Sequence, residues 1–371
     1  MRILVTGGAG FVGSHVTREL IHAGHSVRVL DNLTAQVHGT ERRRPDYLHE
    51  DAAFIYGDVR DAEVLDRALK NVDAVYHLAA LVGVGQSMYR MADYTSVNTY
   101  GTAVLLESVL KYRDRIERLI VASSMSIYGE GLYVDTHGQV CSNCERDPEQ
   151  TRLGQWELRD SRGEVLKPIP TPETKNPSLV SVYALSKFYQ ERMCLAAGRA
   201  YDIPTVALRF FNIYGPHQAL SNPYTGVLAI FAARLLNNKP PLINEDGHQL
   251  RDFVSVHDVA RACRLALESP KAAGQTINVG TGQPMSVRDL AVRMASFLGK
   301  DISPEITGRY RAGDIRHCYA DISLARALLG YQPQVTLADG LGALATWLED
   351  QTADDHVMEC FQELAVRGLM V

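Results

Sequence analysis

Short apolar runs alternate with helical patterns along the first 210 residues of the chain. Residues 3–5, 26–30 and 75–78 are such runs, and apolar positions spaced three and four apart follow several of them. Apolar runs of this length are typical of strands that are buried on both faces of a parallel sheet, and such strands need helical connections. The pattern therefore predicts an α/β fold with a doubly wound parallel sheet.

Two stretches depart from this alternation. Residues 130–177 are polar and rich in turn formers, and so long a loop in a compact domain is usually functional or folds independently. Beyond residue 214, short strands mix with helices. We expect a first domain at 1–214 that includes the insert 130–177, a smaller mixed α/β lobe at 215–350, and a tail at 351–371 that is an extra helix or a partly ordered segment.

A glycine-rich turn joins the first predicted strand to the first predicted helix. The sequence Thr-Gly-Gly-Ala-Gly-Phe-Val-Gly at 6–13 has the spacing of a dinucleotide-binding turn. Backbone N–H groups at a helix N-terminus can face a pyrophosphate there, and a Cβ would block the approach. We expect a Rossmann-type sheet that binds the dinucleotide through Gly7, Gly10, Phe11, Val12 and Gly13.

Asp31 ends the second predicted strand, where a carboxylate can accept hydrogen bonds from the adenosine ribose hydroxyls. The same charge would repel a 2′-phosphate, so the residue favours NAD over NADP; a solvated turn aspartate is the alternative. Arg42, Arg43 and Arg44 could reach the ribose from a loop, although a solvated basic surface is the simpler interpretation.

Further cofactor contacts are expected at the ends of the other predicted strands and on the helix that follows. Asp58 could accept from the adenine amine, and the small residues after residue 77 suit a backbone that passes close to a cofactor. This second predicted set comprises Asn32, Asp58, Val59, Leu78, Ala79, Ala80 and Asn98.

Tyr183 and Lys187 are four residues apart on a predicted helix, so their side chains share one face. A nearby cation favours the phenolate and lowers the tyrosine pKa toward the range of a general base. The pair alone is common on helix surfaces. Its significance comes from the upstream glycine turn and from Ser124, whose hydroxyl ends a predicted strand and can hydrogen-bond a reacting oxygen.

Composition excludes several classes of partner. The 371 residues carry a net charge of −5, which gives no electrostatic footprint for nucleic acid or an anionic membrane surface. The N-terminal apolar run is too short for export or membrane spanning, and the six cysteines do not resemble a disulfide framework. A cytoplasmic location with reduced thiols is expected.

Taken together, the motifs resemble those of the extended short-chain dehydrogenase/reductases of the nucleotide-sugar epimerase/dehydratase family. The resemblance covers nearly everything from residue 1 to about 350 outside the insert, and it rests on the glycine turn, on residues 31–33, 57–59, 77–80, 123–129, 183–187, 209–216, 251–259 and 311–314. It implies an NAD-binding first domain and a second lobe that binds a nucleoside-diphosphate sugar. It also implies a homodimer formed through the helix that bears Tyr183.

The resemblance assigns roles to individual side chains. Tyr183 is implied as the base, Lys187 as the anchor of the nicotinamide ribose, and Ser124 as the group that orients the sugar hydroxyl. The implied substrate-binding set is Val82, Ser124, Ser126, Tyr183, Asn212, Arg251, Arg311 and Asp314. Arginine forks suit a diphosphate, although Arg311 has Asp314 nearby and a surface salt bridge is its alternative.

Residues beside Ser124 bear on the reaction. The 4,6-dehydratases of this family carry an Asp-Glu pair after the catalytic hydroxyl, and the decarboxylating relatives a glutamate; this chain has Met125 and Ser126, which cannot exchange protons usefully. We therefore expect NAD-dependent epimerisation at C4 of a uridine- or deoxythymidine-diphosphate hexose, including 6-deoxy sugars. A 4,6-dehydratase, a net oxidoreductase and a catalytically silent NAD-binding regulator remain alternatives.

The roles of two cysteine-bearing stretches are left open. His137, Cys141 and Cys144 offer three possible zinc ligands in the insert, but a closed structural site needs four, so no metal is predicted and a packed or substrate-covering loop is expected. Cys318 either sets the size of the sugar pocket or is a small buried hydrophobe.

Overall fold

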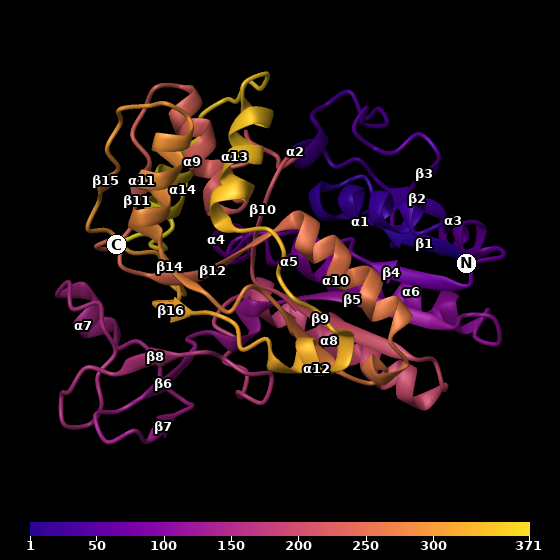
Figure 1. Cartoon of the computed structure of the whole chain (residues 1–371), viewed down its shortest axis with the longest axis horizontal. Coiled ribbons are helices and arrows are strands. Elements are labelled where there is room, and N and C mark those ends of the chain that lie inside the picture. Colours follow the sequence, from indigo (N-terminus) through magenta and orange to yellow (C-terminus); the bar gives the residue numbers. More distant parts are fainter.

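The computed structural model describes all 371 residues and contains one central sheet of seven parallel strands (Figure 1). Their order across the sheet is β13-β9-β5-β4-β1-β2-β3. The strands are β1 (Arg2–Thr6), β2 (Ser26–Asp31), β3 (Ala53–Tyr56), β4 (Ala74–His77), β5 (Arg118–Ser124), β9 (Thr205–Phe210) and β13 (Thr276–Val279). The chain winds outward in both directions from β1 and β4, which leaves a crevice at the carboxyl ends of these two strands. The predicted doubly wound sheet is confirmed.

Long helices cover both faces of this sheet. One face carries α1 (Phe11–His22), α10 (Val256–Glu268) and α12 (Ser323–Leu329), and the other carries α3 (Ala62–Leu69), α6 (Gly101–Leu110) and α8 (Val182–Ala200). Ile3 and Val5 pack in the core under the first group, whereas Leu4 packs in the core under the second. Successive side chains of a strand point to opposite faces, so an unbroken apolar run is needed to fill both cores.

Short helical turns connect the strands near their carboxyl ends. They are α2 (Ala35–His38), α4 (Val84–Ser87), α5 (Met91–Tyr94), a π-helical turn (Thr95–Tyr100) and a 3₁₀ turn at Met125–Tyr128. A further 3₁₀ turn, Pro270–Ala272, lies between α10 and the start of β13.

A smaller lobe packs beside the carboxyl ends of the strands (Figure 1). Its mixed sheet contains β10 (Asn212–Tyr214), β12 (Leu250–Ser255), β14 (Pro284–Ser286) and β16 (His317–Cys318), and β11 (Leu242–Ile243) pairs with β15 (Glu305–Ile306). Three helices, α9 (Val227–Leu236), α11 (Val287–Phe297) and α13 (Leu337–Leu348), enclose its core. The expected smaller mixed α/β lobe is therefore present.

The chain passes between the two lobes more than once. Strand β13 and helices α10 and α12 belong to the range 215–350, yet they pack on the large sheet. The linear division at residue 214 stays a prediction about domain boundaries.

The insert 130–177 has its own small fold, at the lower left of Figure 1. It contains a three-stranded antiparallel sheet of β6 (Leu132–Val134), β7 (Val140–Cys141) and β8 (Lys167–Ile169), with a short helix α7 (Pro148–Arg152). Tyr133, Leu158 and Leu166 form its core. A polar loop with turn formers can fold in this way because three buried side chains close a miniature core.

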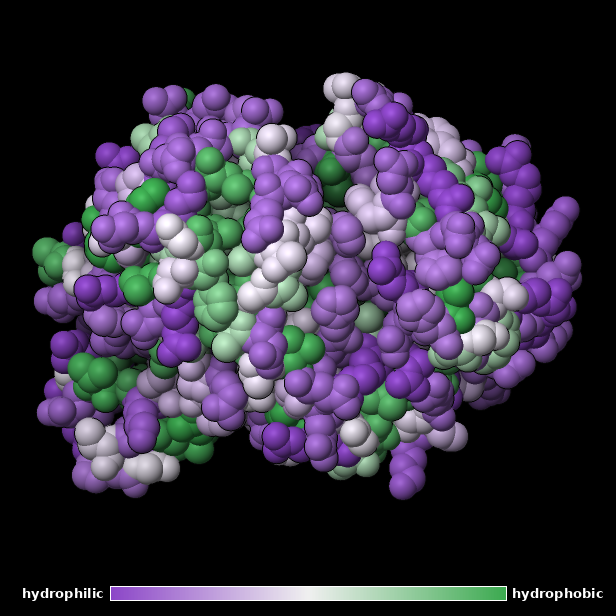
Figure 2. Space-filling model, turned by 45° about the horizontal axis from the view of Figure 1, so that its top comes forward, coloured by the Kyte–Doolittle hydropathy of each residue, from purple (hydrophilic) through white to green (hydrophobic).

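The last residues form helix α14 (Val357–Val366), and residues beyond it pair with the segment at 310–312. Of the two possibilities expected for the tail, the structure shows the helix. No helix in the chain combines the length and the apolar character that crossing a membrane requires. Figure 2 shows hydrophobic residues scattered in small groups among hydrophilic ones on the face it presents.

Candidate active site

A cavity of about 600 Å³ lies between the large sheet and the smaller lobe. Its walls come from the carboxyl ends of β1, β2, β4, β5 and β9, from the start of α8, and from the smaller lobe. Every predicted substrate-binding residue lines it, and so does every predicted cofactor-binding residue except Asn98. The tertiary structure thus brings together residues that are more than 300 positions apart in the chain.

The glycine turn forms part of the cavity wall. Gly7 has φ +71°, and a Cβ there would lie 2.7 Å from the backbone nitrogen of Ala79. A Cβ on Gly13 would lie 2.1 Å from the carbonyl oxygen of Gly7. Helix α1 begins after Gly10 without a side-chain cap, so its first N–H groups can donate to a pyrophosphate. These residues fit a dinucleotide.

Asp31 lies beside this turn at the end of β2. Its carboxylate accepts hydrogen bonds from the backbone N–H groups of Ala9, at 3.1 Å, and Leu33, at 2.9 Å, and it lines the cavity. Arg42 and Arg44 bond instead to Tyr56 and to backbone carbonyls at 49–50. The structure favours the surface interpretation for these arginines.

Asp58 is a second acidic group that lines the cavity. Arg60 donates to it at 2.7 and 2.8 Å, and Asn32 donates at 2.9 Å. The hydrogen bonds from Arg60, more than any other cause, hold the pKa of Asp58 at about 2. The group is therefore an ionised acceptor at neutral pH.

Asn98 lies outside the cavity wall, unlike the other predicted cofactor residues. It is fully buried in the π-helical turn, and its amide bonds to both backbone groups of Leu81, at 2.7 and 3.0 Å, and to the hydroxyl of Ser186 at 2.9 Å. Its side chain therefore holds the loop after β4 in place.

Ser124 and Tyr183 both line the cavity, and their side chains form a hydrogen bond. Ser124 ends β5, and its Oγ accepts from the backbone N–H of Ser126 at 3.2 Å and from its hydroxyl at 2.9 Å. Tyr183 lies in the first turn of α8, which Ser181 caps by accepting from Ala184 at 3.1 Å. The N–H of Tyr183 also donates to Ser87 Oγ at 3.0 Å, so both ends of this pair have fixed positions.

The electrostatics of Tyr183 differ from the expectation. Burial raises its pKa, and the hydrogen bond with Ser124 opposes the rise only in part. The predicted lowering by Lys187 is absent because the Lys187 ammonium donates to Gln190 Oε1 at 2.8 Å, and burial lowers its own pKa to about 8. The loss of hydration that a phenolate suffers on burial outweighs the hydrogen bond with Ser124.

Gln190 was not expected from the sequence, although its spacing of three from Lys187 places it on the same helical face. Its amide nitrogen donates to Thr102 Oγ1 at 2.9 Å and lies 3.1 Å from His77 Nε2. Burial lowers the pKa of His77 to about 3, so this network is neutral apart from the ammonium. Gln190 thus fixes where the lysine charge lies.

Arg251, Arg311 and Asp314 are among the charged residues of the smaller lobe that line the cavity. Arg311 donates to Asp314 at 2.6 and 2.9 Å, so the alternative of a salt bridge holds, but both side chains also line the cavity. Arg251 donates to the carbonyls of Leu250 and Arg316, each at 2.9 Å. Two guanidinium groups on one cavity wall can bind the oxygens of a diphosphate.

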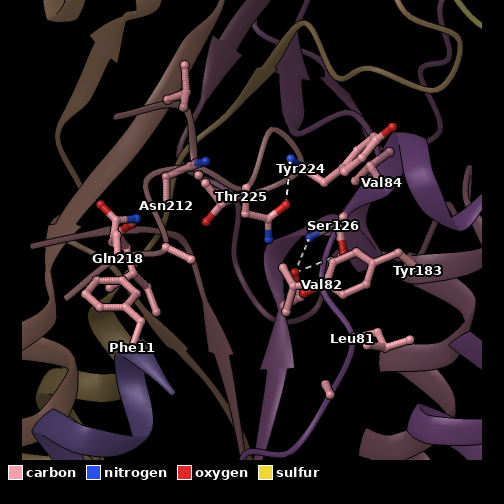
Figure 3. Close-up of a pocket in the computed structure, with 18 of the residues that line it drawn as sticks. Phe11, Leu81, Val82, Val84, Ser126, Tyr183, Asn212, Gln218, Tyr224 and Thr225 are labelled. Carbon is pink, nitrogen blue, oxygen red and sulfur yellow. Dashed lines mark hydrogen bonds between the residues drawn. The ribbon is translucent and has the colours of Figure 1, made fainter. Parts of the chain in front are cut away.

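The part of the cavity beside Tyr183 has both apolar and polar walls. Val82, Val84 and Tyr224 surround it with Ser126 and Thr225 (Figure 3), and Asn212 lies farther along. The amide oxygen of Asn212 is buried without a hydrogen-bond partner, so it can accept from a ligand. Met125, beside Ser124, is buried and has no proton to exchange.

Cys318 does not line the cavity. It is 1% exposed, and its Sγ lies 3.8 Å from Thr171 Oγ1 in the core. The structure therefore supports the small buried hydrophobe. In the insert, His137 bonds to Arg162 at 2.7 Å and Cys144 to the carbonyl of Cys141 at 3.5 Å.

Comparison with known proteins identifies relatives that are named as nucleotide-sugar epimerases. The family model for the NAD dependent epimerase/dehydratase family matches residues 3–150 and 162–280. A dTDP-L-rhamnose 4-epimerase from Burkholderia thailandensis is 36% identical over 94% of this chain and 95% of its own length. A UDP-glucose 4-epimerase from Mus musculus is 31% identical over 89% of this chain and 91% of its own.

Solved structures agree with these relatives. The UDP-glucose 4-epimerase of Thermotoga maritima, solved with UDP-glucose, has a TM-score of 0.76 at 31% identity and covers 94% of this chain and 99% of its own. The UDP-glucuronic acid 4-epimerase of Bacillus cereus, solved with UDP-glucuronic acid and NAD, has a TM-score of 0.76 at 29% identity, with the same coverage. On its sequence, its fold and its cavity, the chain belongs to the NAD-dependent epimerase/dehydratase family.

Proposed function

We propose that the protein is an NAD-dependent 4-epimerase of a nucleoside-diphosphate sugar, which acts through a transient 4-keto sugar. The observation that carries the proposal is the shared cavity: Ser124 and Tyr183 line the same cavity as the dinucleotide turn and as Arg251 and Arg311. The glycine turn would hold NAD, and the bound cofactor would supply reversible hydride acceptance at C4. The relatives named as 4-epimerases support the same reaction.

The residues of the chain would handle the proton and hold the substrate. Tyr183 Oη, in its phenolate form, would take the proton of the 4-hydroxyl, and Ser124 Oγ would hydrogen-bond the same oxygen. Lys187 supplies a buried positive charge near the base. The arginines hold the diphosphate, so that the keto sugar can turn over in its pocket while the nucleotide stays bound.

The other assignments are part of this proposal. The glycine turn, Asp31, Asn32, Asp58, Val59 and residues 78–80 would bind NAD, and their position on the cavity wall supports it. The substrate would contact Val82, Ser126, Asn212 and Asp314. Asn98, by contrast, would act through the loop that it holds.

Met125 and Ser126 argue against the dehydratase alternative. Elimination of water needs an acid and a base near C5 and C6, and neither side chain next to Ser124 provides one. A net oxidoreductase would release NADH with turnover. A silent regulator would not need the intact Ser124, Tyr183 and Lys187.

The sugar is proposed to be a uridine- or deoxythymidine-diphosphate hexose, 6-deoxy sugars included. Leu81, Val82 and Val84 give the pocket an apolar side that suits a methyl group (Figure 3). The 36% identical relative is named for dTDP-L-rhamnose, which is consistent with this class.

A homodimer through α8 is also proposed. Leu185 and Tyr189 are 51% and 47% exposed on that helix, and Tyr100 is 57% exposed on the adjoining π-helical turn. An apolar helix face of this kind would be buried in a dimer, and a monomer in light scattering at micromolar concentration would contradict it. The cytoplasmic location stays a prediction, and the six free cysteines are compatible with it.

The test is incubation of the purified protein with a panel of uridine- and thymidine-diphosphate sugars, followed by mass spectrometry and proton NMR. A product of unchanged mass with altered H4 couplings is expected. Loss of the mass of water would establish a dehydratase instead, and accumulation of NADH an oxidoreductase.

A further inference from the structure

The Arg251 guanidinium rests on the backbone of a neighbouring segment. Its Nη1 donates to the carbonyl of Arg316 at 2.9 Å and its Nη2 donates to the carbonyl of Ile315. Strand β16 pairs with β12 in the same place, so that Arg251 lies opposite Cys318. The position of residues 315–316 therefore sets the direction in which this cation faces the cavity.

Side chains around Arg316 hold that segment. Arg316 is fully buried, and its guanidinium donates to Glu245 at 2.9 Å, to Asp246 at 2.7 and 3.0 Å, and to Glu157 at 3.0 Å through Nε. A buried guanidinium with this many carboxylate partners has one allowed position, because any displacement would leave a buried charge unpaired. Its carbonyl is fixed with it.

The insert supplies the partners that the smaller lobe does not. Glu157 lies in the insert, and Glu130 at its start accepts from the backbone N–H of Arg316 at 2.7 Å and of His317 at 3.2 Å. Arg146 reaches the same place, with a 2.5 Å bond to Glu245. Three insert side chains thus converge on residues 314–317 and their acidic neighbours.

Glu157 is the central contact of the three. It also bonds His317 Nε2 at 2.9 Å. Burial raises its pKa, but the hydrogen bonds from His317 and Arg316 more than offset this and hold the pKa at about 2. The carboxylate is therefore charged at any working pH.

We propose that the insert positions the diphosphate-binding arginine: Glu157, assisted by Glu130, fixes Arg316 and thereby the carbonyls that orient Arg251 toward the substrate. This inference rests on the proposed function, since it assigns the diphosphate to Arg251. Glu157 is a positioning residue that does not touch the substrate. The insert would then serve binding of the nucleotide and leave the hydride step unaffected.

A double-mutant cycle tests the proposal. The variants are Glu157→Gln, Arg251→Ala and the double variant, and the readouts are the Kd of uridine or thymidine diphosphate by calorimetry, the KM and kcat for the active sugar, and the Kd of NAD. We expect Glu157→Gln to weaken diphosphate binding about tenfold, with kcat and NAD binding unchanged. The double variant should bind like Arg251→Ala alone, because the effect of Glu157 passes through Arg251.

Glu164→Gln is the matched control. Glu164 is an exposed acid of the same insert, but the side chains of Arg316 and His317 bond to Glu157 and not to Glu164. It should behave as the wild type. If Glu157→Gln no longer binds NAD, Glu157→Asp replaces it in the same cycle. It keeps the charge but shortens the side chain by one methylene.

Two results would overturn the proposal. Unchanged diphosphate affinity in Glu157→Gln would show that the insert does not act on the site, and additive losses in the double variant would show a merely structural role. A wrong proposed function would give a different result from a wrong role for the insert. In that case the wild type itself would bind neither the diphosphate nor the sugar, which is seen before any variant is compared.

Discussion

Burial acts in opposite directions on the two titratable side chains of the catalytic face. It raises the pKa of Tyr183 and lowers the pKa of Lys187, since in each case the charged form loses hydration. Ser124 limits the first change by hydrogen bonding, and Gln190 holds the ammonium at 2.8 Å. The reactivity of single residues is therefore a property of their surroundings.

Replacement of the phenol gives the first prediction. Tyr183→Phe removes the proton acceptor and keeps the ring, so kcat should fall about 10³-fold while NAD binding stays intact. Tyr189→Phe on the same helix is the control and should leave kcat unchanged, because Tyr189 is 47% exposed and outside the cavity. Equal loss in both variants would point to damage of the helix.

The buried ammonium gives the second prediction. The pKa of Lys187 is about 8 in the folded chain, against an ordinary value of 10.5 for a solvated lysine, so the unfolded chain binds more protons between these values. The free energy of unfolding of the wild type should therefore rise relative to Lys187→Met as the pH increases from 8 to 10.5, by about 1–3 kcal/mol. Urea unfolding of both proteins at pH 7 and pH 10.5 measures it. A difference that stays constant across this window would contradict the buried, charged lysine.

At the scale of elements, helix α14 contributes to the cavity from the far end of the chain. Val357, Cys360, Phe361 and Leu364 of this helix line it. The Glu363 carboxylate fastens the helix, since it accepts from Tyr224 at 2.6 Å and from Tyr89 at 2.9 Å.

Loosening this helix gives the third prediction. Glu363→Ala leaves two tyrosine hydroxyls without their charged acceptor, so KM for the nucleotide sugar should rise about 3- to 10-fold, with NAD affinity unchanged. Glu359→Ala on the same helix should have no effect, because Glu359 bonds only to the exposed His356. Steady-state kinetics of both variants decides, and an unchanged KM in Glu363→Ala would show that α14 does not support the site.

At the scale of the whole molecule, the cavity joins two lobes that the chain crosses several times. Strand β13 and helices α10 and α12 return to the large sheet after the smaller lobe has begun. A ligand that touches both lobes binds only when both are folded and together, so its binding energy adds to the stability of the whole chain.

Cofactor binding gives the fourth prediction. NAD at a hundredfold excess over its Kd should raise the free energy of unfolding by about 2.7 kcal/mol, visible as a higher Tm. NADP should raise it less, because the Asp31 carboxylate, which lines the cavity and is proposed to bind the adenosine ribose, would repel a 2′-phosphate. In Asp31→Ser the difference between the Tm shifts caused by NAD and by NADP should become smaller. Equal Tm shifts with the two cofactors in the wild type would contradict the proposed contact of Asp31 with the ribose.

The sequence by itself determined the parallel sheet, the glycine turn and the pair of Tyr183 and Lys187 on one helix. These features depend on residue type and spacing within a few turns of chain, where backbone geometry alone fixes which side chains are neighbours. Nearly all of the site residues predicted from the sequence also line the cavity, because the carboxyl ends of parallel strands meet at one edge.

Only the tertiary structure decided which contacts those side chains make. In the folded chain the Lys187 ammonium bonds to Gln190, Asn98 lies outside the cavity wall, and Cys318 is buried in the core. Arg251 donates to the carbonyl of Arg316, 65 residues away, and Glu157 of the insert accepts from the Arg316 side chain. Contacts at such separation depend on packing and on the desolvation of each charge, and both of these exist only once the chain has folded.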